Sequence, residues 1–85
     1  MVVSMRVRVY VSLKPTVLDP QGKTIRAALN GLGHQSVADV RQGKFFEMYL
    51  DSQDDDARLR QEVEQIAHDV LANPVIEEYR IEFLD

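Results

Sequence analysis

A short run at residues 22–24 has the residue types that phosphate-binding loops use. Gly22-Lys23-Thr24 matches the end of a P-loop, in which backbone N–H groups cradle phosphate. The full pattern needs a glycine five residues before Gly22, and that position holds Val17. The run is therefore better explained as the solvated first turn of a helix.

Acidic residues and histidines are the candidate metal ligands. The carboxylates of Asp54-Asp55-Asp56 are consecutive, and consecutive side chains on a helix do not converge on one cation. They suit the positive end of a helix instead. His34 and His68 have no second ligand at metal-binding spacing, and the chain contains no cysteine. The sequence predicts no catalytic residue, no cofactor-binding residue and no metal ligand.

A basic corner formed by Lys14, Arg41 and Lys44 could hold the carboxylate or phosphate of a small ligand. Carboxylates of the same chain are nearby in the sequence, so internal ion pairing is favoured over a small-ligand site. For a protein partner, the same charges would serve as orienting groups.

Length and charge limit the class of protein. A chain of 85 residues predicts one domain, residues 1–85, and a net charge of −4 argues against nucleic-acid or anionic-membrane binding. No apolar run approaches the ~20 residues of a membrane span, and no signal-peptide pattern begins the chain. We therefore expect a cytoplasmic domain.

Two elements are predicted in the first half of the chain. Residues 5–13 alternate apolar and polar side chains and predict a half-buried strand. A helix over about residues 20–32 follows, with Asp19 as its N-cap and Pro20 at its first position. Gly22 in the first turn weakens such a helix, and capping does not explain it.

Residues 37–50 are predicted to be extended, and two forms fit. One is a long strand bent at Gly43; the other is a hairpin with its loop at Gln42–Lys44. The hairpin would place Asp39 opposite Glu47, a like-charge pair, so the bent strand is preferred.

The second half predicts a helix and a strand. Apolar residues recur at helical spacing up to the stop at Asn73-Pro74, and residues 75–84 alternate. The apolar positions of the helix are Leu59, Val63, Ile66, Ala67, Val70 and Leu71. The predicted fold class is α+β, with order β-α-β-α-β, a long bent central strand, and both helices on one face of an antiparallel sheet.

The other face of this sheet mixes aromatic and arginine side chains, including Tyr10, Phe45 and Tyr49. These residue types are enriched at protein–protein interfaces, and unpaired sheet edges favour pairing. An ordinary solvated face is the alternative. We expect a homo-oligomer built through the sheet.

Four stretches in order resemble the PurS subunit family of phosphoribosylformylglycinamidine synthase. They are Val9-Tyr10-Val11-Ser12-Leu13-Lys14, Val17-Leu18-Asp19-Pro20-Gln21-Gly22, Asp39-Val40-Arg41-Gln42-Gly43-Lys44 and Leu71-Ala72-Asn73-Pro74-Val75-Ile76-Glu77-Glu78-Tyr79-Arg80. Each stretch alone is weak evidence for the family. Together the four stretches are specific, and they span nearly the whole chain. Pro74 departs from the family pattern.

The resemblance implies a non-catalytic accessory subunit of de novo purine biosynthesis. Such a subunit bridges an ATP-dependent synthetase subunit and a glutaminase subunit, so that glutamine-derived ammonia reaches formylglycinamide ribonucleotide. The complex uses ATP, Mg and glutamine, and this chain is expected to bind no cofactor. A homodimer or homotetramer is implied.

The partner-binding residues predicted from these motifs are Leu18, Asp19, Pro20, Gln21, Gly22, Arg41, Gly43 and Lys44. Of these, Gln21, Arg41 and Lys44 have the weakest structural explanation. A different class of function stays open, that of a stand-alone dimeric module that binds a small ligand.

Overall fold

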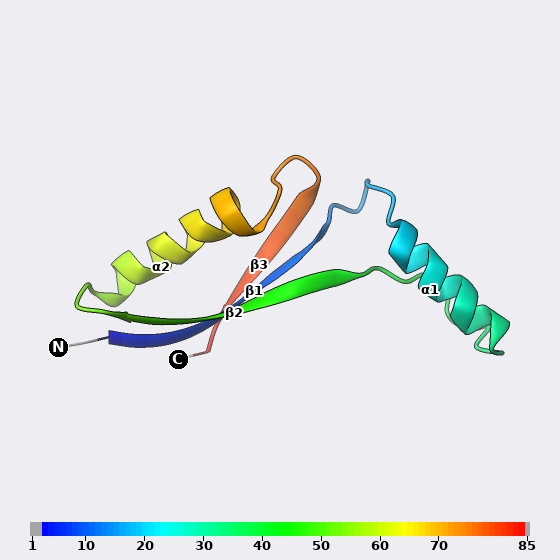
Figure 1. Cartoon of the computed structure of the whole chain (residues 1–85), viewed down its shortest axis with the longest axis horizontal. Helices are drawn as coiled ribbons and strands as arrows, with labels where there is room; N and C mark the ends of the chain where they lie inside the picture. Colours follow the sequence, from blue (N-terminus) through cyan, green and yellow to red (C-terminus); the bar gives the residue numbers. More distant parts are fainter. Residues whose placement is uncertain (1–2, 85) are drawn as a thin grey trace.

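The computed structural model of the protein describes residues 3–84. The elements are β1 (Val3–Leu13), α1 (Pro20–Gly31), β2 (Gly43–Ser52), α2 (Asp56–Ile66) and β3 (Glu77–Phe83), and a π-helical turn, η1 (Ala67–Leu71), continues α2. This α+β order matches the β-α-β-α-β prediction (Figure 1). No helix within residues 3–84 is long and apolar enough to cross a bilayer.

The three strands form one antiparallel sheet in the order β2-β1-β3. Partners run from Val3↔Ser52 to Ser12↔Gly43 on one side of β1, and from Val7↔Phe83 to Leu13↔Glu77 on the other. The central strand is therefore β1, and β2 is an edge strand. The prediction that the strand within residues 37–50 is the central one is wrong.

The prediction of one bent strand over residues 37–50 is wrong, and so is the hairpin at Gly43. β2 begins at Gly43 and runs unbroken to Ser52, whereas residues 37–42 form no strand. The ladder stops because the Gln42 N–H donates to the Asp19 carboxylate, with N···O 2.8 Å, instead of to β1. Alternating side chains could not reveal this competing acceptor.

The core lies between the sheet and α2. From β1, the side chains of Met5, Val7, Val9 and Val11 are buried, as their alternation predicts, and they meet Leu59, Val63, Ala67 and Ala72. Partly buried side chains of β2 and β3 complete this cluster. Burying apolar side chains of this size stabilises the fold by roughly 1.5–3 kcal/mol each.

The prediction that both helices cover one face of the sheet is wrong. Only α2 lies along the sheet, and α1 extends beyond its end (Figure 1). The molecule therefore measures 55 × 25 × 14 Å, with a radius of gyration of 17.0 Å. A compact chain of this length would have a radius of about 12 Å. The apolar stripe of α1 stays partly open, since Ile25 is 39% and Leu32 77% exposed.

The last turn of the second helix also departs from the predicted periodicity. The Ala72 N–H donates to the Ala67 carbonyl five residues earlier, with N···O 3.0 Å, which is the π-helical pattern. The wider turn directs Val70 outward, where it is 74% exposed, and buries Ala72 in the core. Val70 is thus not a core residue.

Candidate functional site

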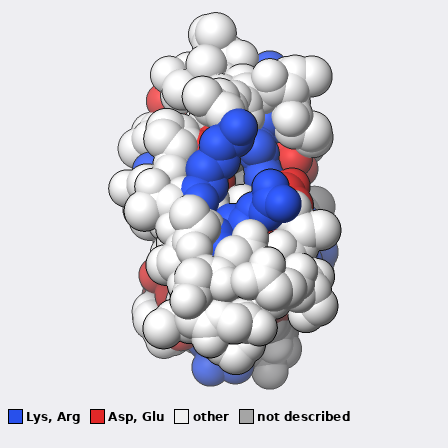
Figure 2. Space-filling view, turned by 90° about the vertical axis from the view of Figure 1, so that its right-hand side faces the viewer, with Lys and Arg blue, Asp and Glu red and all other residues white. Residues whose placement is uncertain are grey.

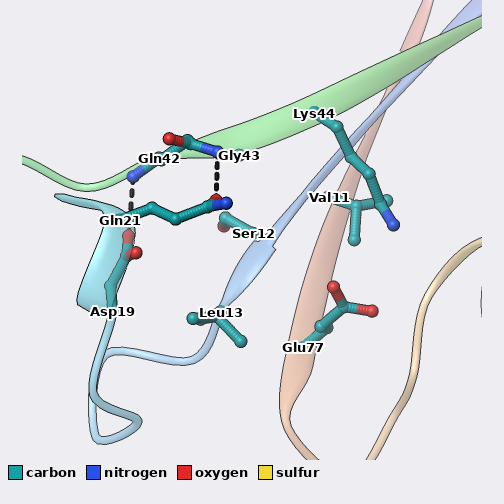
Figure 3. Close-up of a pocket in the computed structure, with 9 residues that line it drawn as sticks. All are labelled: Val11, Ser12, Leu13, Asp19, Gln21, Gln42, Gly43, Lys44 and Glu77. Atoms are coloured by element: carbon teal, nitrogen blue, oxygen red, sulfur yellow. Dashed lines mark hydrogen bonds between the residues drawn. The ribbon is translucent and has the colours of Figure 1, made fainter.

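The segments 17–22 and 39–44, far apart in the sequence, meet where α1 joins the sheet, and we call this region the junction (Figure 3). Asp19 is its centre and is only 4% exposed. Its Oδ1 accepts from the Gly22 N–H at 2.9 Å and its Oδ2 from the Gln42 N–H at 2.8 Å. The predicted N-cap is confirmed, and the same carboxylate also ties α1 to β2.

The electrostatic environment of Asp19 favours its ionised form. The hydrogen bond from the Gln42 backbone, followed by that from Gly22 and by the charge of Arg41, holds the pKa of the Asp19 carboxyl below its usual range. Burial acts in the opposite direction and is outweighed. An ionised Asp19 therefore belongs to the folded junction at neutral pH.

A glycine is needed at position 22 because the backbone at Val40 passes very close to it. A Cβ at this position would lie 2.1 Å from the Val40 carbonyl oxygen and 2.9 Å from Asp19 Oδ2. Only glycine lets the segment at residues 39–42 pass directly over the first turn of α1. The residue that capping left unexplained in the sequence is thus required by tertiary contact.

Arg41 fastens the loop after β1 to the start of β2. Its Nη2 donates to the carbonyl oxygens of Lys14 at 2.9 Å, Val17 at 3.0 Å and Leu13 at 3.4 Å. Arg41 therefore has a structural role within the chain, although it remains exposed to solvent. The sequence offered no signal for these contacts, because the acceptors are backbone atoms.

A hollow of about 260 Å³ opens on the sheet side of the junction. Figure 3 shows Lys44 and Glu77 on opposite sides of it, with Gln21 and Gln42 joined by a hydrogen bond between their amide groups. Its lining consists of Val11, Ser12, Leu13, Asp19, Gln21, Gln42, Gly43, Lys44 and Glu77. Four of the predicted partner-binding residues thus line one hollow.

The other predicted residues do not line this hollow. Leu18 is 62% exposed, Pro20 is exposed at the start of α1, and Gly22 is buried. Gln42 and Glu77 line the hollow but were absent from the predicted set. Gln42 could have been found from its place in the motif at residues 39–44, whereas nothing in the sequence places Glu77 nearby.

The acidic run and the histidines take structural or exposed positions. Asp55 caps α2, because its Oδ1 accepts from the Arg58 N–H at 2.8 Å, and Asp56 pairs with Arg60 at 2.9 Å. His34 and His68 are exposed. Within residues 3–84, no three His, Cys, Asp or Glu side chains are placed to hold a metal ion. The helix-end interpretation of the acidic run is confirmed.

The face of the sheet opposite α2 carries stacked arginine and aromatic side chains. The Arg80 guanidinium lies 4.3 Å from the ring centroid of Tyr10, and that of Arg8 lies 5.6 Å from Phe45. The Tyr10 and Phe45 rings are 5.8 Å apart, and Phe45 and Tyr49 are 56% and 73% exposed. This surface has the composition of a protein–protein interface.

The sequence is similar to known proteins along almost all of its length. The family model PurS, described as phosphoribosylformylglycinamidine (FGAM) synthase, matches residues 6–85. The PurS subunit of this synthase from Mycobacterium leprae (strain TN) is 47% identical over 76 residues, covering 89% of this chain and 91% of the relative. The PurS subunit of Bacillus subtilis (strain 168) is 46% identical over 77 residues, covering 91% and 89%.

Solved structures agree with the fold. The C2 crystal form of B. subtilis PurS has a TM-score of 0.84 at 43% identity, covering 95% of this chain and 99% of that one. The structure of PurLQS from Thermotoga maritima contains a chain with a TM-score of 0.85 at 26% identity, covering 95% and 98%. The resemblance inferred from four sequence stretches is confirmed: this chain belongs to the PurS family, the family of PurS subunits of phosphoribosylformylglycinamidine synthase.

Proposed function

We propose that this chain is a non-catalytic subunit of phosphoribosylformylglycinamidine synthase in de novo purine biosynthesis. It bridges the ATP-dependent synthetase subunit and the glutaminase subunit, so that ammonia released from glutamine reaches formylglycinamide ribonucleotide. The observation that carries the proposal is identity of 47% with a PurS subunit over about nine tenths of both chains. Holding two reaction sites in fixed relative placement lets a released intermediate react before it escapes.

The shape of the chain supports a bridging role. At 55 Å long and 14 Å thick, it exposes surfaces at both ends to neighbours. Apolar side chains stay open on α1 and at its start, with Leu18 62% and Leu32 77% exposed. A chain that leaves a whole helix outside its core is suited to bind partner proteins.

We also propose that the chain forms a homodimer or homotetramer through its sheet. The outer edges of β2 and β3 pair with no strand of residues 3–84, and unpaired edges favour association. Sedimentation at micromolar concentration should give a multiple of the 9.7 kDa chain mass. A single 9.7 kDa species would contradict this assignment.

ATP, Mg and glutamine are cofactors and substrates of the complex, and we propose that this chain alone binds none of them. Adding each to the isolated chain should leave its melting temperature unchanged. A shift of several degrees would favour the alternative of a stand-alone ligand-binding module. We expect the assembled enzyme in the cytoplasm.

The central experiment compares two nitrogen sources. The cognate synthetase and glutaminase subunits are assayed for amidine formation with and without this chain, first with glutamine and then with an ammonium salt. Glutamine-driven activity should require the chain, and ammonium-driven activity should not. Equal glutamine-driven rates with and without the chain would refute the bridging role.

Among the residues predicted to contact partners, the exposed ones are the better candidates for direct contact. Leu18 offers an apolar side chain at the edge of the junction, and Lys44 offers a charge in the hollow. Leu18→Ser should weaken binding to the cognate subunits by about tenfold, since it removes one exposed apolar anchor. Val70→Ser is the matched control, because Val70 is 74% exposed on a different element.

A further inference from the structure

A second hollow lies on the outer side of α1, between this helix and the chain at residues 38–39. Its volume is about 570 Å³. It is lined by Lys23, Arg26, Ala27, Asn30, Ala38 and Asp39. Viewed toward the α1 end of the molecule, Lys and Arg side chains gather around the middle of the surface (Figure 2).

The charge of this end is opposite to that of the chain as a whole. Residues 20–44 contain two lysines and two arginines against one carboxylate, Asp39, although the net charge of the chain is −4. Residues 51–71, around α2, contain seven carboxylates and two arginines. The two ends of the elongated molecule therefore carry opposite charge, and the α1 end is the basic one.

The cations of the hollow are available to a partner. Lys23 and Arg26 are both exposed, and within residues 3–84 neither forms an ion pair within 4.0 Å. The Asp39 carboxylate instead accepts from the Val40 N–H at 2.9 Å. Exposed cations that no internal carboxylate neutralises attract an acidic surface.

The hollow is preformed by hydrogen bonds of the loop after α1. The Asn30 Nδ2 donates to the His34 carbonyl at 2.8 Å and to the Val37 carbonyl at 3.3 Å. These bonds hold residues 37–39 beside the helix. The small side chains of Ala27 and Ala38 leave space between the two walls, so a carboxylate side chain of a partner can enter.

We propose that this basic hollow docks an acidic surface of another subunit of the enzyme complex, with Lys23 and Arg26 as the contact residues. The inference rests on the proposed function, because it assumes that the chain works within a complex. A contact between the α1 helices of two copies would place like charges together. Contact of the basic α1 end of one copy with the acidic α2 end of another is the competing occupant, and the oligomeric state of the variant below tests it. Nucleic acid is disfavoured by the net charge of −4.

The test measures binding of the full-length chain to the separately purified cognate synthetase and glutaminase subunits. Arg26→Glu should weaken binding to one of them by about five- to tenfold at 0.1 M salt, because an attraction becomes a repulsion. Arg58→Glu is the matched control: it makes the same charge change at an exposed site on α2 and should change binding less than about twofold. Arg26→Lys should restore binding, and added salt should weaken the wild-type complex more than the Arg26→Glu complex.

The outcomes separate the two proposals. If the wild-type chain binds neither subunit, the proposed function fails, and the docking site fails with it. If the wild-type chain binds but Arg26→Glu and Arg58→Glu bind equally well, only the docking site is overturned. Dissociation of the homo-oligomer by Arg26→Glu would assign the hollow to a second copy and would also overturn the proposal. Circular dichroism and thermal unfolding of each variant exclude misfolding as the cause.

Discussion

Substituting Gly22 by alanine tests the junction most directly, because two physical effects predict opposite signs. In an open helical turn, glycine to alanine stabilises a protein by about 0.5–1 kcal/mol. At Gly22 the added Cβ would lie 2.1 Å from the Val40 carbonyl oxygen, whereas real Cβ contacts are essentially never under 3.0 Å. The backbone at residues 39–42 must therefore move by about 0.9 Å, and overpacking of this kind costs about 1–3 kcal/mol.

The net expectation for Gly22→Ala is a loss of about 1–2 kcal/mol in the free energy of unfolding, which lowers the melting temperature of a domain of this size by about 4–16 °C. Urea and thermal unfolding at one protein concentration measure it, since association shifts apparent stability. Amide chemical shifts of Gly22 and Gln42 should move, because the carboxylate bridge between them is displaced.

Gly31→Ala is the control within the same helix. No atom lies within 4 Å of a Cβ built at Gly31, so this variant should be neutral or stabilised by up to about 1 kcal/mol. If Gly22→Ala is as stable as Gly31→Ala, the close passage of residues 39–42 over α1 is refuted.

Three further predictions concern stability. The ordinary pKa of an Asp carboxyl is about 3.8, and that of Asp19 is lower in the folded protein, so lowering the pH from about 3.8 through the folded pKa should destabilise the wild type by removing a stabilising charge. Asp19→Asn should flatten this part of the pH–stability curve, and equal slopes for the two proteins would contradict the carboxylate bridge. Leu59→Ala should cost about 2–5 kcal/mol in chemical denaturation, whereas Val70→Ala should cost less than about 0.5 kcal/mol; a large loss for Val70 would refute the π-helical turn. Arg41→Met should lower the melting temperature by several degrees through loss of its carbonyl contacts, and an unchanged value would show that they contribute nothing.

The sequence alone determined the family and most of the local elements. Strict alternation in β1 identified the buried face, because a strand places successive side chains on opposite sides. Asp19 and Pro20 marked the start of α1, since capping depends on neighbouring backbone groups. The motifs at residues 17–22 and 39–44 indicated the PurS family, because their specific residue types are not needed merely to form a helix or a strand.

Only the tertiary structure decided where those elements lie relative to one another. The amphipathic stripe of α1 predicted packing on the face of the sheet, but the helix stands beyond the end of the sheet. Residues 37–42 have strand-like alternation, yet the Asp19 carboxylate takes the N–H of Gln42 that would have extended the ladder. The requirement for glycine at position 22 and the contacts of Arg41 likewise depend on backbone atoms about 18 to 28 residues away. Such contacts leave no periodicity in the sequence, since backbone acceptors are the same for every residue type.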